Sequence, residues 1–333
     1  MRVLITGGAG FVGSHLAEEF LRRGDTVLAF DSGPPDKVRH LLRHPCFSFI
    51  RGSVLDEDVL DRLIAECDLV YHLAAVVGVD HYVAAPQEVL DVNINGTQNV
   101  LKAACKRQRK VVFGSTSEVY GRNPKVPWSE DDDRVLGSTR VDRWCYATSK
   151  AVGEHFCFAY HRLGLPVTVL RYFNVYGPRL DQLDSGRVVT VFLGQALRGE
   201  PITVIGNGRQ TRCFTYVDDC VRATVAAGVY PGTDGEVFNI GTNVETTILE
   251  LAQLIIELTG TRSPIRFVSS EDVYGSSYED IPRRVPDVSK MRTVLGLCAN
   301  TSLRVGLQRT IDWFRQQAAQ AGVVHAYAAG PQG

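Results

Sequence analysis

Apolar and polar residues along the first thirty positions change from a strand-like pattern to a helix-like one and back. Residues 3–6 are a short apolar run, which predicts a buried strand. From Ser14 the apolar residues recur at helical spacing, as in Leu16 and Phe20, with charged residues on the opposite side. Gly24 ends this predicted helix, and residues 26–30 form a second apolar run. The order strand, helix, strand predicts one βαβ unit of a parallel sheet.

The same alternation continues through much of the chain. Apolar runs at 69–73, 111–113, 167–171 and 237–240 predict further strands, and helix-like stretches at 89–105 and 150–162 lie between them. The predicted fold class is α/β, a Rossmann-type doubly wound parallel sheet with a smaller C-terminal substrate-binding lobe.

Domain boundaries follow from a change in this pattern after residue 172, where glycines and prolines break the chain into short segments. Residues 237–240 then return to the sheet. We expect a sheet domain of residues 1–172 plus about 236–262, and a smaller lobe of residues 173–235 plus about 263–315. Residues 316–333, rich in Ala, Gln and Gly, are expected to form a disordered tail.

Composition narrows the possible classes of function. The 333 residues include 36 Lys and Arg against 37 Asp and Glu, so the net charge of −1 creates no long-range field for nucleic acid or anionic lipid. The eight cysteines form no CxxC pair, which indicates free thiols in the cytoplasm, and we expect no metal site. No apolar run reaches about 18 residues, so we expect no membrane span. The apolar residues 3–5 before the first glycines are too few for a signal-peptide core, so we expect no export.

A glycine-rich turn joins the first strand to its helix. Gly7, Gly10 and Gly13 let the turn tighten, let a pyrophosphate approach the backbone, and let helix and strand pack closely. The helix N-terminus offers N–H groups to phosphates. Asp31 follows the second strand, where a carboxylate accepts from ribose hydroxyls and would repel a 2′-phosphate. The pattern predicts a dinucleotide site that favours NAD over NADP.

Tyr146 and Lys150 lie one helical turn apart, and so share one face of a predicted helix. An ammonium group near a phenol favours the phenolate. We therefore expect Lys150, together with the positive nicotinamide of NAD+, to lower the pKa of Tyr146 and make it a base. Thr116 and its neighbours follow the strand 111–113 at the carboxyl edge of the sheet, where a cofactor binds. These motifs predict a catalytic centre at that edge.

With these motifs the chain resembles an extended short-chain dehydrogenase/reductase of the NAD-dependent sugar-nucleotide epimerase, dehydratase and decarboxylase superfamily. The resemblance covers residues 1 to about 314 and includes the segments 72–75, 93–97, 171–178 and 211–219. It implies that Tyr146, supported by Lys150, takes the proton of the sugar 4-hydroxyl as hydride leaves C4 for NAD+. It also implies that Thr116 hydrogen-bonds the same oxygen.

The motifs that contain Glu118 and the pair Arg283-Arg284 resemble those of UDP-glucuronate decarboxylases. These enzymes include the UDP-xylose synthases and the decarboxylase domain of the lipid A aminoarabinose pathway. The resemblance implies that Arg284 holds the substrate carboxylate and then donates a proton. Glu118 is then a local acid or base, or presses on that carboxylate, and Ser117 donates to the sugar. Alternatively, Glu118 is a strand-end acid paired with an arginine. The implied reaction is NAD-dependent decarboxylation of UDP-glucuronic acid through a UDP-4-keto-hexuronate, giving UDP-4-keto-pentose, UDP-xylose or both.

The resemblance also implies which residues line the cofactor half and the substrate half of the site. Arg212 and Asn174 are implied to contact the diphosphate of the sugar nucleotide. At the adenine, Ser53 stands where the family often has an acid, which removes one contact. The implied cofactor residues are Gly7, Gly10, Phe11, Val12, Gly13, Asp31, Ser53, Val54, Leu73, Ala74, Ala75, Tyr146, Lys150 and Phe173. The implied substrate residues are Val77, Tyr82, Thr116, Ser117, Arg143, Asn174, Arg187, Thr203, Arg212, Tyr278 and Arg284.

Several alternatives stay open at this stage. A UDP-glucuronate 4-epimerase shares the substrate and the first step but keeps the carboxylate. Another nucleotide-sugar epimerase or dehydratase and a non-catalytic NAD-binding regulator are less favoured. Release or reduction of the 4-keto pentose also stays open. We expect a UDP-sugar substrate, no nucleic-acid or membrane partner, and a homodimer paired through the helices in 89–105 and from 150 onward.

Overall fold

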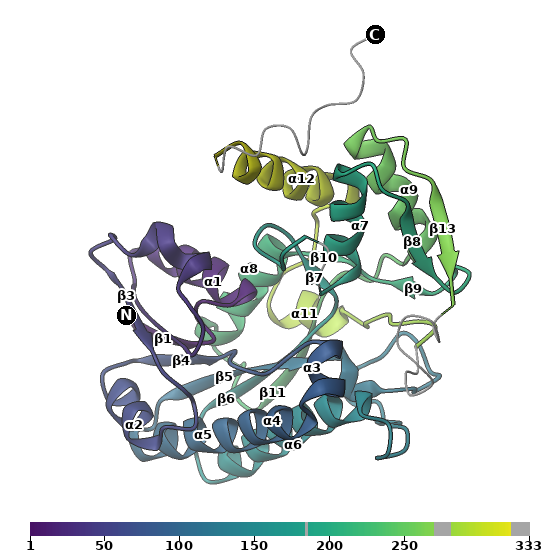
Figure 1. Cartoon of the computed structure of the whole chain (residues 1–333). Helices are drawn as coiled ribbons and strands as arrows, with labels where there is room; N and C mark the ends of the chain where they lie inside the picture. The colour runs from purple at the N-terminus through teal and green to yellow at the C-terminus, as the bar shows by residue number, and fades with distance from the viewer. Residues whose placement is uncertain (184–185, 270–280, 321–333) are drawn as a thin grey trace.

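Seven parallel strands form the central sheet of the computed structural model, in the order β11-β6-β5-β4-β1-β2-β3 (Figure 1). The structure describes residues 1–183, 186–269 and 281–320, apart from the side chains of Val79, Asp80 and Val83. The order changes direction between β1 and β4, and ligands of doubly wound sheets bind at such switch points. The predicted Rossmann-type sheet is confirmed. Its strands are β1 (Arg2–Thr6), β2 (Thr26–Asp31), β3 (Phe47–Arg51), β4 (Leu69–His72), β5 (Lys110–Thr116), β6 (Val167–Tyr172) and β11 (Glu236–Ile240).

Both faces of the sheet are covered, because successive residues of a strand face opposite sides. In β1, Val3 and Ile5 join the core shared with α1 (Phe11–Arg22) and α8 (Val217–Val229). Leu4 joins the opposite core, which includes residues of α2 (Glu57–Ala65), α5 (Gly96–Arg107) and α6 (Arg143–Arg162). The near-continuous apolar runs of these strands follow from burial on both sides.

Two local differences from the sequence prediction concern the first half of the chain. The helix predicted over 89–105 is three pieces, α4 (Pro86–Leu90), a π-helical turn η2 (Asp91–Asn95), and α5. The edge strand β3 was not predicted, because its residues after Phe47 are partly or fully exposed and lack the apolar run of a central strand.

A second group of elements lies beside the carboxyl ends of the strands (Figure 1). There β8 (Ile202–Ile205) pairs with β13 (Ile265–Val268), and β9 (Thr211–Arg212) pairs with β12 (Thr246–Thr247). The helix α7 (Val188–Leu197) packs on α9 (Ile248–Thr259), which also contacts α12 (Leu303–Gln320). Thus α9, expected within the sheet domain, contacts elements of the smaller lobe, and the exact division stays a prediction. The remaining elements are η1 (Asp36–Leu41), α3 (Val79–Ala84), η3 (Ser117–Tyr120), β7 (Val175–Tyr176), β10 (Thr215–Tyr216) and α11 (Ser289–Val294).

The C-terminal end differs from the expected tail at one point. Because α12 continues to Gln320, residues 316–320 are helical, whereas a disordered tail was expected from residue 316. Residues 321–333 of the expected tail lie outside the described residues.

Candidate active site

A cleft of about 2530 Å³ runs along the carboxyl ends of β1, β2, β4 and β5, and the second group of elements forms its other wall. Its surface includes residues of the glycine turn, the segment after β4, the end of β5, the start of α6 and the segment before α7. Of the predicted site residues that the structure describes, all except Phe173 line this cleft. Tyr278 lies outside the described residues.

The glycine turn is built for close packing. Gly7 has a φ of +72°, and a Cβ on Gly13 would lie 2.1 Å from the Gly7 carbonyl oxygen, so a side chain at either position is excluded. The helix α1 begins after Gly10, and among the described residues no side chain caps its first turn. Its first N–H groups, with the positive end of the helix dipole, therefore face the cleft through Phe11 and Val12.

Asp31, at the end of β2, is fixed next to this turn. Its Oδ2 accepts from the Ala9 backbone N–H at 2.9 Å, and its Oδ1 accepts from the Gly33 N–H at 2.9 Å. Each carboxylate oxygen has a second lone pair. The oriented carboxylate and the uncapped helix start together fit the ribose and pyrophosphate of a dinucleotide.

Lys150 and Tyr146 lie on one face of α6, as predicted, but their interactions differ from the expectation. The Lys150 ammonium donates to the Gly114 carbonyl at 2.7 Å and lies 4.6 Å from the Phe113 ring centre, and burial lowers its pKa to about 8. Burial and the negative charge of Glu118 raise the pKa of Tyr146, while Arg187 and a hydrogen bond with Thr116 lower it. Within the protein alone, the expected lowering by Lys150 is therefore not found.

Asn93, for which the sequence predicted no role, connects α6 to the segment after β4. Its side chain bonds both backbone groups of Val76, at 2.8 and 3.2 Å, and donates to Ser149 Oγ at 3.1 Å. Ser149 in turn donates to the Tyr146 carbonyl at 2.8 Å. Asn93 lies in the π-helical turn, and such turns often occur at functional sites. Only the family segment 93–97 pointed to it.

Glu118 is held between two buried arginines. Its Oε1 lies 2.5 Å from Arg284, and its Oε2 lies 3.3 Å from Arg143. Burial raises the pKa of Glu118, but the charges of Arg284 and Arg143 outweigh it and lower the pKa to about 2. The two arginines therefore favour the carboxylate form of Glu118 at neutral pH. The arginine pairing that the sequence left as an alternative is present, and it lies inside the cleft.

A second buried ion pair links α6 to β6. Arg171 in β6 bonds Glu154 in α6 through two nitrogens, at 2.7 and 3.0 Å. Ser115 in β5 donates to the same carboxylate at 2.5 Å, and Tyr120 accepts from Arg171 at 2.8 Å. These contacts tie α6 to β5 and β6. Sequence patterns assigned Arg171 and Glu154 only to a strand and a helix, because the pair forms only when the fold brings them together.

The predicted substrate residues lie in the half of the cleft beyond Tyr146. Asn174 has a φ of +37°, and its buried side-chain nitrogen has no hydrogen-bond partner in the described structure. Arg212 donates to the carbonyls of Thr211 and Ile281, and Thr203 is bonded by Gln195. The remaining predicted lining includes Val77, Ser117 and Arg187.

Two aromatic residues take different positions. The Tyr82 ring stacks on the Tyr146 ring, with centres 4.9 Å apart and planes 11° from parallel. Phe173 is fully buried against Tyr120 and Trp128, and its backbone N–H donates to Ile240. Phe173 therefore does not contribute to the cleft surface, and its predicted place in the cofactor lining is not supported. Its apolar side chain is accounted for by core packing.

The residues predicted for the two ends of the cofactor line the cleft in two groups. Ser53 and Val54 lie beyond β3, and Leu73, Ala74 and Ala75 follow β4. All eight cysteines carry free thiols. Among residues that the structure describes, no group of three or more His, Cys, Asp or Glu side chains is placed to hold a metal ion. No helix within the described ranges is both long and apolar enough to cross a membrane.

Comparison with known proteins gives consistent matches. The model of the NAD dependent epimerase/dehydratase family matches residues 3–241. UDP-N-acetyl-alpha-D-glucosaminuronate decarboxylase of Bacillus cytotoxicus is 45% identical over 95% of this chain and 98% of its own. UDP-glucuronic acid decarboxylase 1 of Xenopus tropicalis is 38% identical over 95% of this chain and 72% of its own. The structure of UDP-glucuronic acid 4-epimerase from Bacillus cereus, with UDP-glucuronic acid and NAD, is 34% identical with a TM-score of 0.85, over 95% of this chain and 100% of the other.

Proposed function

Because this chain belongs to the NAD-dependent epimerase/dehydratase family, we propose that it is an NAD-dependent UDP-glucuronic acid decarboxylase. The reaction passes through a UDP-4-keto-hexuronate. Release after the loss of CO2 gives UDP-4-keto-pentose, whereas return to C4 of the hydride removed in the first step, with the Tyr146 proton passing to the C4 oxygen, gives UDP-xylose. The observation that carries the proposal is the pair of buried arginines, Arg284 and Arg143, which meet at Glu118 next to Tyr146. Two guanidinium groups in a cleft of this kind suit a sugar carboxylate.

Cofactor binding uses the first βαβ unit. NAD+, when bound, supplies the hydride acceptor for C4 and a positive ring at the catalytic tyrosine. The N–H groups at the start of α1 hold the pyrophosphate, and the Asp31 carboxylate accepts from the adenosine ribose hydroxyls. Since Asp31 is already oriented by Ala9 and Gly33, it meets a ribose without rearrangement and repels a 2′-phosphate.

Oxidation at C4 needs a base at the sugar 4-hydroxyl. Tyr146 takes that proton, and Thr116, which already hydrogen-bonds Tyr146, contacts the same oxygen. Burial and Glu118 oppose formation of the phenolate, whereas Arg187 favours it. The charge of Arg187 and the positive ring of the cofactor therefore act in the same direction.

Decarboxylation follows because the 4-keto sugar is a β-keto acid. The bond from C5 to the carboxylate breaks, CO2 leaves, and the electron pair moves into an enolate whose charge lies on the C4 oxygen. Tyr146, protonated in the first step, and Thr116 donate to that oxygen and stabilise it. Arg284 and Arg143 hold the carboxylate before it leaves. Arg284 then donates the proton that C5 takes up, which re-forms the C4 carbonyl, and Arg284 regains a proton from water. Glu118, in its carboxylate form, keeps both arginines in position.

A second substrate has specific support. The relative from Bacillus cytotoxicus, 45% identical to this chain, is named for UDP-N-acetyl-alpha-D-glucosaminuronate. This compound differs from UDP-glucuronic acid by an acetamido group in place of the C2 hydroxyl, and it keeps the C5 carboxylate. The chemistry at C4 and C5 is therefore the same for both, and the choice between them depends on contacts at C2.

The test is direct. The protein, with NAD+, is given UDP-glucuronic acid or UDP-N-acetylglucosaminuronic acid labelled at C6, and released CO2 is counted while the nucleotide product is identified by mass spectrometry. Labelled CO2 and a UDP-pentose are expected. UDP-galacturonic acid without CO2 would identify a 4-epimerase instead, and an unchanged hexuronate with both substrates would exclude the proposal.

The assembly and the compartment belong to the same proposal. The chain forms a homodimer through α5 and α6, which lie side by side on the outer face of the sheet (Figure 1). It works in the cytoplasm, where the eight free thiols stay reduced. Light scattering of the purified protein measures the mass of the assembly, and a monomer at working concentration would exclude the dimer.

A further inference from the structure

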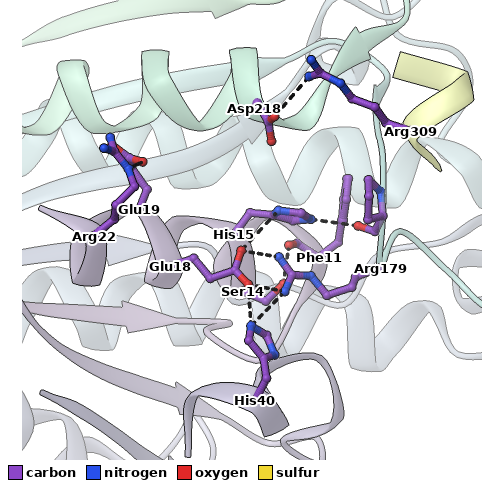
Figure 2. A network of polar contacts seen from close by, with 11 residues as sticks. Phe11, Ser14, His15, Glu18, Glu19, Arg22, His40, Arg179, Asp218 and Arg309 are labelled. Carbon is purple, nitrogen blue, oxygen red and sulfur yellow. Dashed lines mark hydrogen bonds and ion pairs between the residues drawn. The ribbon is translucent and has the colours of Figure 1, made fainter. Parts of the chain in front are cut away.

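Three consecutive residues after β7, namely 178–180, are each held by a side chain from the first forty residues of the chain. Figure 2 shows His15, Glu18 and Arg179 in this network. The His15 ring lies 2.8 Å from the Pro178 carbonyl oxygen, so the ring nitrogen donates because a carbonyl only accepts. Lys37 donates to the Leu180 carbonyl at 2.8 Å. Between them, both terminal nitrogens of Arg179 bond the two Glu18 oxygens, each at 2.7 Å.

The Glu18–Arg179 pair is stronger than an ordinary surface ion pair. It is bidentate, and the Arg179 side chain is only 11% exposed, although that of Glu18 is 37% exposed. His40 lies 2.5 Å from the same Glu18 carboxylate and adds a third partner to the network. Arg179 also has a φ of +66°, a left-handed conformation that costs free energy for a residue with a Cβ. Such a conformation persists where surrounding contacts fix it. The contacts at Pro178, Arg179 and Leu180 do so.

The held segment leads directly into the substrate half of the cleft. Leu180 and Asp181 line the cleft, as does Arg187 at the start of α7. The Asp181 carboxylate accepts from the Arg187 backbone N–H at 3.1 Å and from its guanidinium at 3.0 Å. The position of Arg187 therefore depends on Asp181, and that of Asp181 depends on the contacts at 178–180. Glu18, Arg179, His15 and Lys37 are themselves absent from the cleft surface as far as the described residues define it.

We propose that Glu18 and Arg179 are positioning residues, which place Arg187 relative to Tyr146 and the UDP-sugar by fixing the segment 178–181 against α1. The activity measurements that test this inference rest on the proposed function. The contacts from which it is argued are independent of that function. If Arg187 moves away, the cleft loses a cation at the anionic substrate and Tyr146 loses the charge that favours its phenolate. Binding of the UDP-sugar and the pH dependence of the reaction should change together.

The experiment uses Glu18→Gln, which keeps the size of the side chain but removes its charge, alone and combined with Arg187→Ala. Glu19→Gln is the matched control, because Glu19 is next in the same helix (Figure 2). Its side chain pairs with Arg22, which is 74% exposed, and with no other residue in the described part of the chain. Glu18→Gln should raise the KM for the UDP-sugar and the Kd for UDP by about tenfold, with an unchanged Kd for NAD+. Glu19→Gln should change neither.

Two further results separate positioning from general damage. Because Glu18 acts through Arg187, adding Glu18→Gln to Arg187→Ala should cause no further loss, and each single variant should move the acidic limb of the kcat profile to higher pH. Additive effects, an unchanged KM in Glu18→Gln, or an unmoved profile would overturn the proposal. If Glu18→Gln does not fold, Arg179→Lys replaces it. If the wild type releases no CO2, the proposed function fails, and the UDP-binding cycle still decides the role of Glu18.

Discussion

Replacing Glu118 by glutamine should destabilise the protein at neutral pH, in addition to stopping CO2 release. Glutamine keeps the shape of the side chain and one acceptor oxygen but removes the charge that Arg284 and Arg143 share. These arginine side chains are 8% and 5% exposed, so solvent cannot replace the lost carboxylate. Removing one member of a buried ionic cluster leaves charge uncompensated, which is strongly destabilising.

The expected magnitude follows from the pKa of Glu118. A value of about 2, against an ordinary 4.5, corresponds to a preference of about 3 kcal/mol for the charged carboxylate in the folded state. Because 18% of the side chain is exposed, solvent screens part of this, and we expect a loss of about 2 to 3 kcal/mol in the free energy of unfolding. Since the folded pKa lies below the unfolded one, the contribution is complete above about pH 4.5 and is lost as the pH falls towards 2.

Urea unfolding followed by tryptophan fluorescence measures this difference, because Trp128 and Trp144 are buried near the site. The gap between wild type and Glu118→Gln should narrow by about 1 kcal/mol between pH 5 and pH 3.5. Glu245→Gln is the control, since Glu245 pairs with Arg283, whose side chain is 55% exposed, and a surface pair contributes at most about 1 kcal/mol. Equal stability of wild type and Glu118→Gln at pH 7, or a gap independent of pH, would refute the reasoning.

The other predictions concern the proposed cofactor site and the residues of α6. Tyr146→Phe should lower kcat by at least about 100-fold with an unchanged Kd for NAD+, measured by turnover and calorimetry; normal turnover would exclude Tyr146 as the base. Lys150 has a pKa of about 8 in the folded state, below its unfolded value, so the folded protein loses this proton first as the pH rises. Between about pH 8 and 10.5 the wild type should therefore gain stability relative to Lys150→Met in denaturant titrations. A difference that does not change with pH would contradict the buried ammonium. Gly13→Ala should abolish NAD+ binding and also lower the stability of the protein, because its Cβ would meet the Gly7 backbone. Gly24→Ala, where a Cβ meets nothing within 4 Å, should bind NAD+ normally despite its φ of +83°.

Local signals explain what the sequence predicted. The glycine turn, Asp31 and the central strands are recognisable because each depends on a few neighbouring residues, such as an apolar run or a glycine that a Cβ would disrupt. The shared face of Tyr146 and Lys150 could also be predicted from neighbouring residues, because two residues four apart in a helix lie on the same side. These features were predicted within a few residues of their observed positions.

Contacts between distant segments were harder to predict. Glu118 and Arg284 are 166 residues apart, and only the family resemblance related them. The Arg171 and Glu154 pair gave no sequence signal, because a charged residue in a strand and one in a helix look the same whether they are paired or exposed. Phe173 was placed in the cofactor lining because it lies within a family segment, yet the fold turns it into the core.

The π-helical turn at residues 91–95 also changes the phase of the helix that follows it. In an α-helix each residue rotates the chain by about 100°, and a π-helical turn holds one residue more than the α-helical turn it replaces. Deleting one residue there would restore a continuous α-helix. The deletion would also turn the residues before it by about 100° relative to those after it. Either Asn93 would then lose its contacts with Val76 and Ser149, or α5 would lose its packing on α2 and α6. The extra residue therefore lets one run of helix do two things. At one end it places Asn93 at the carboxyl edge of the sheet, and at the other it packs α5 against α2 and α6.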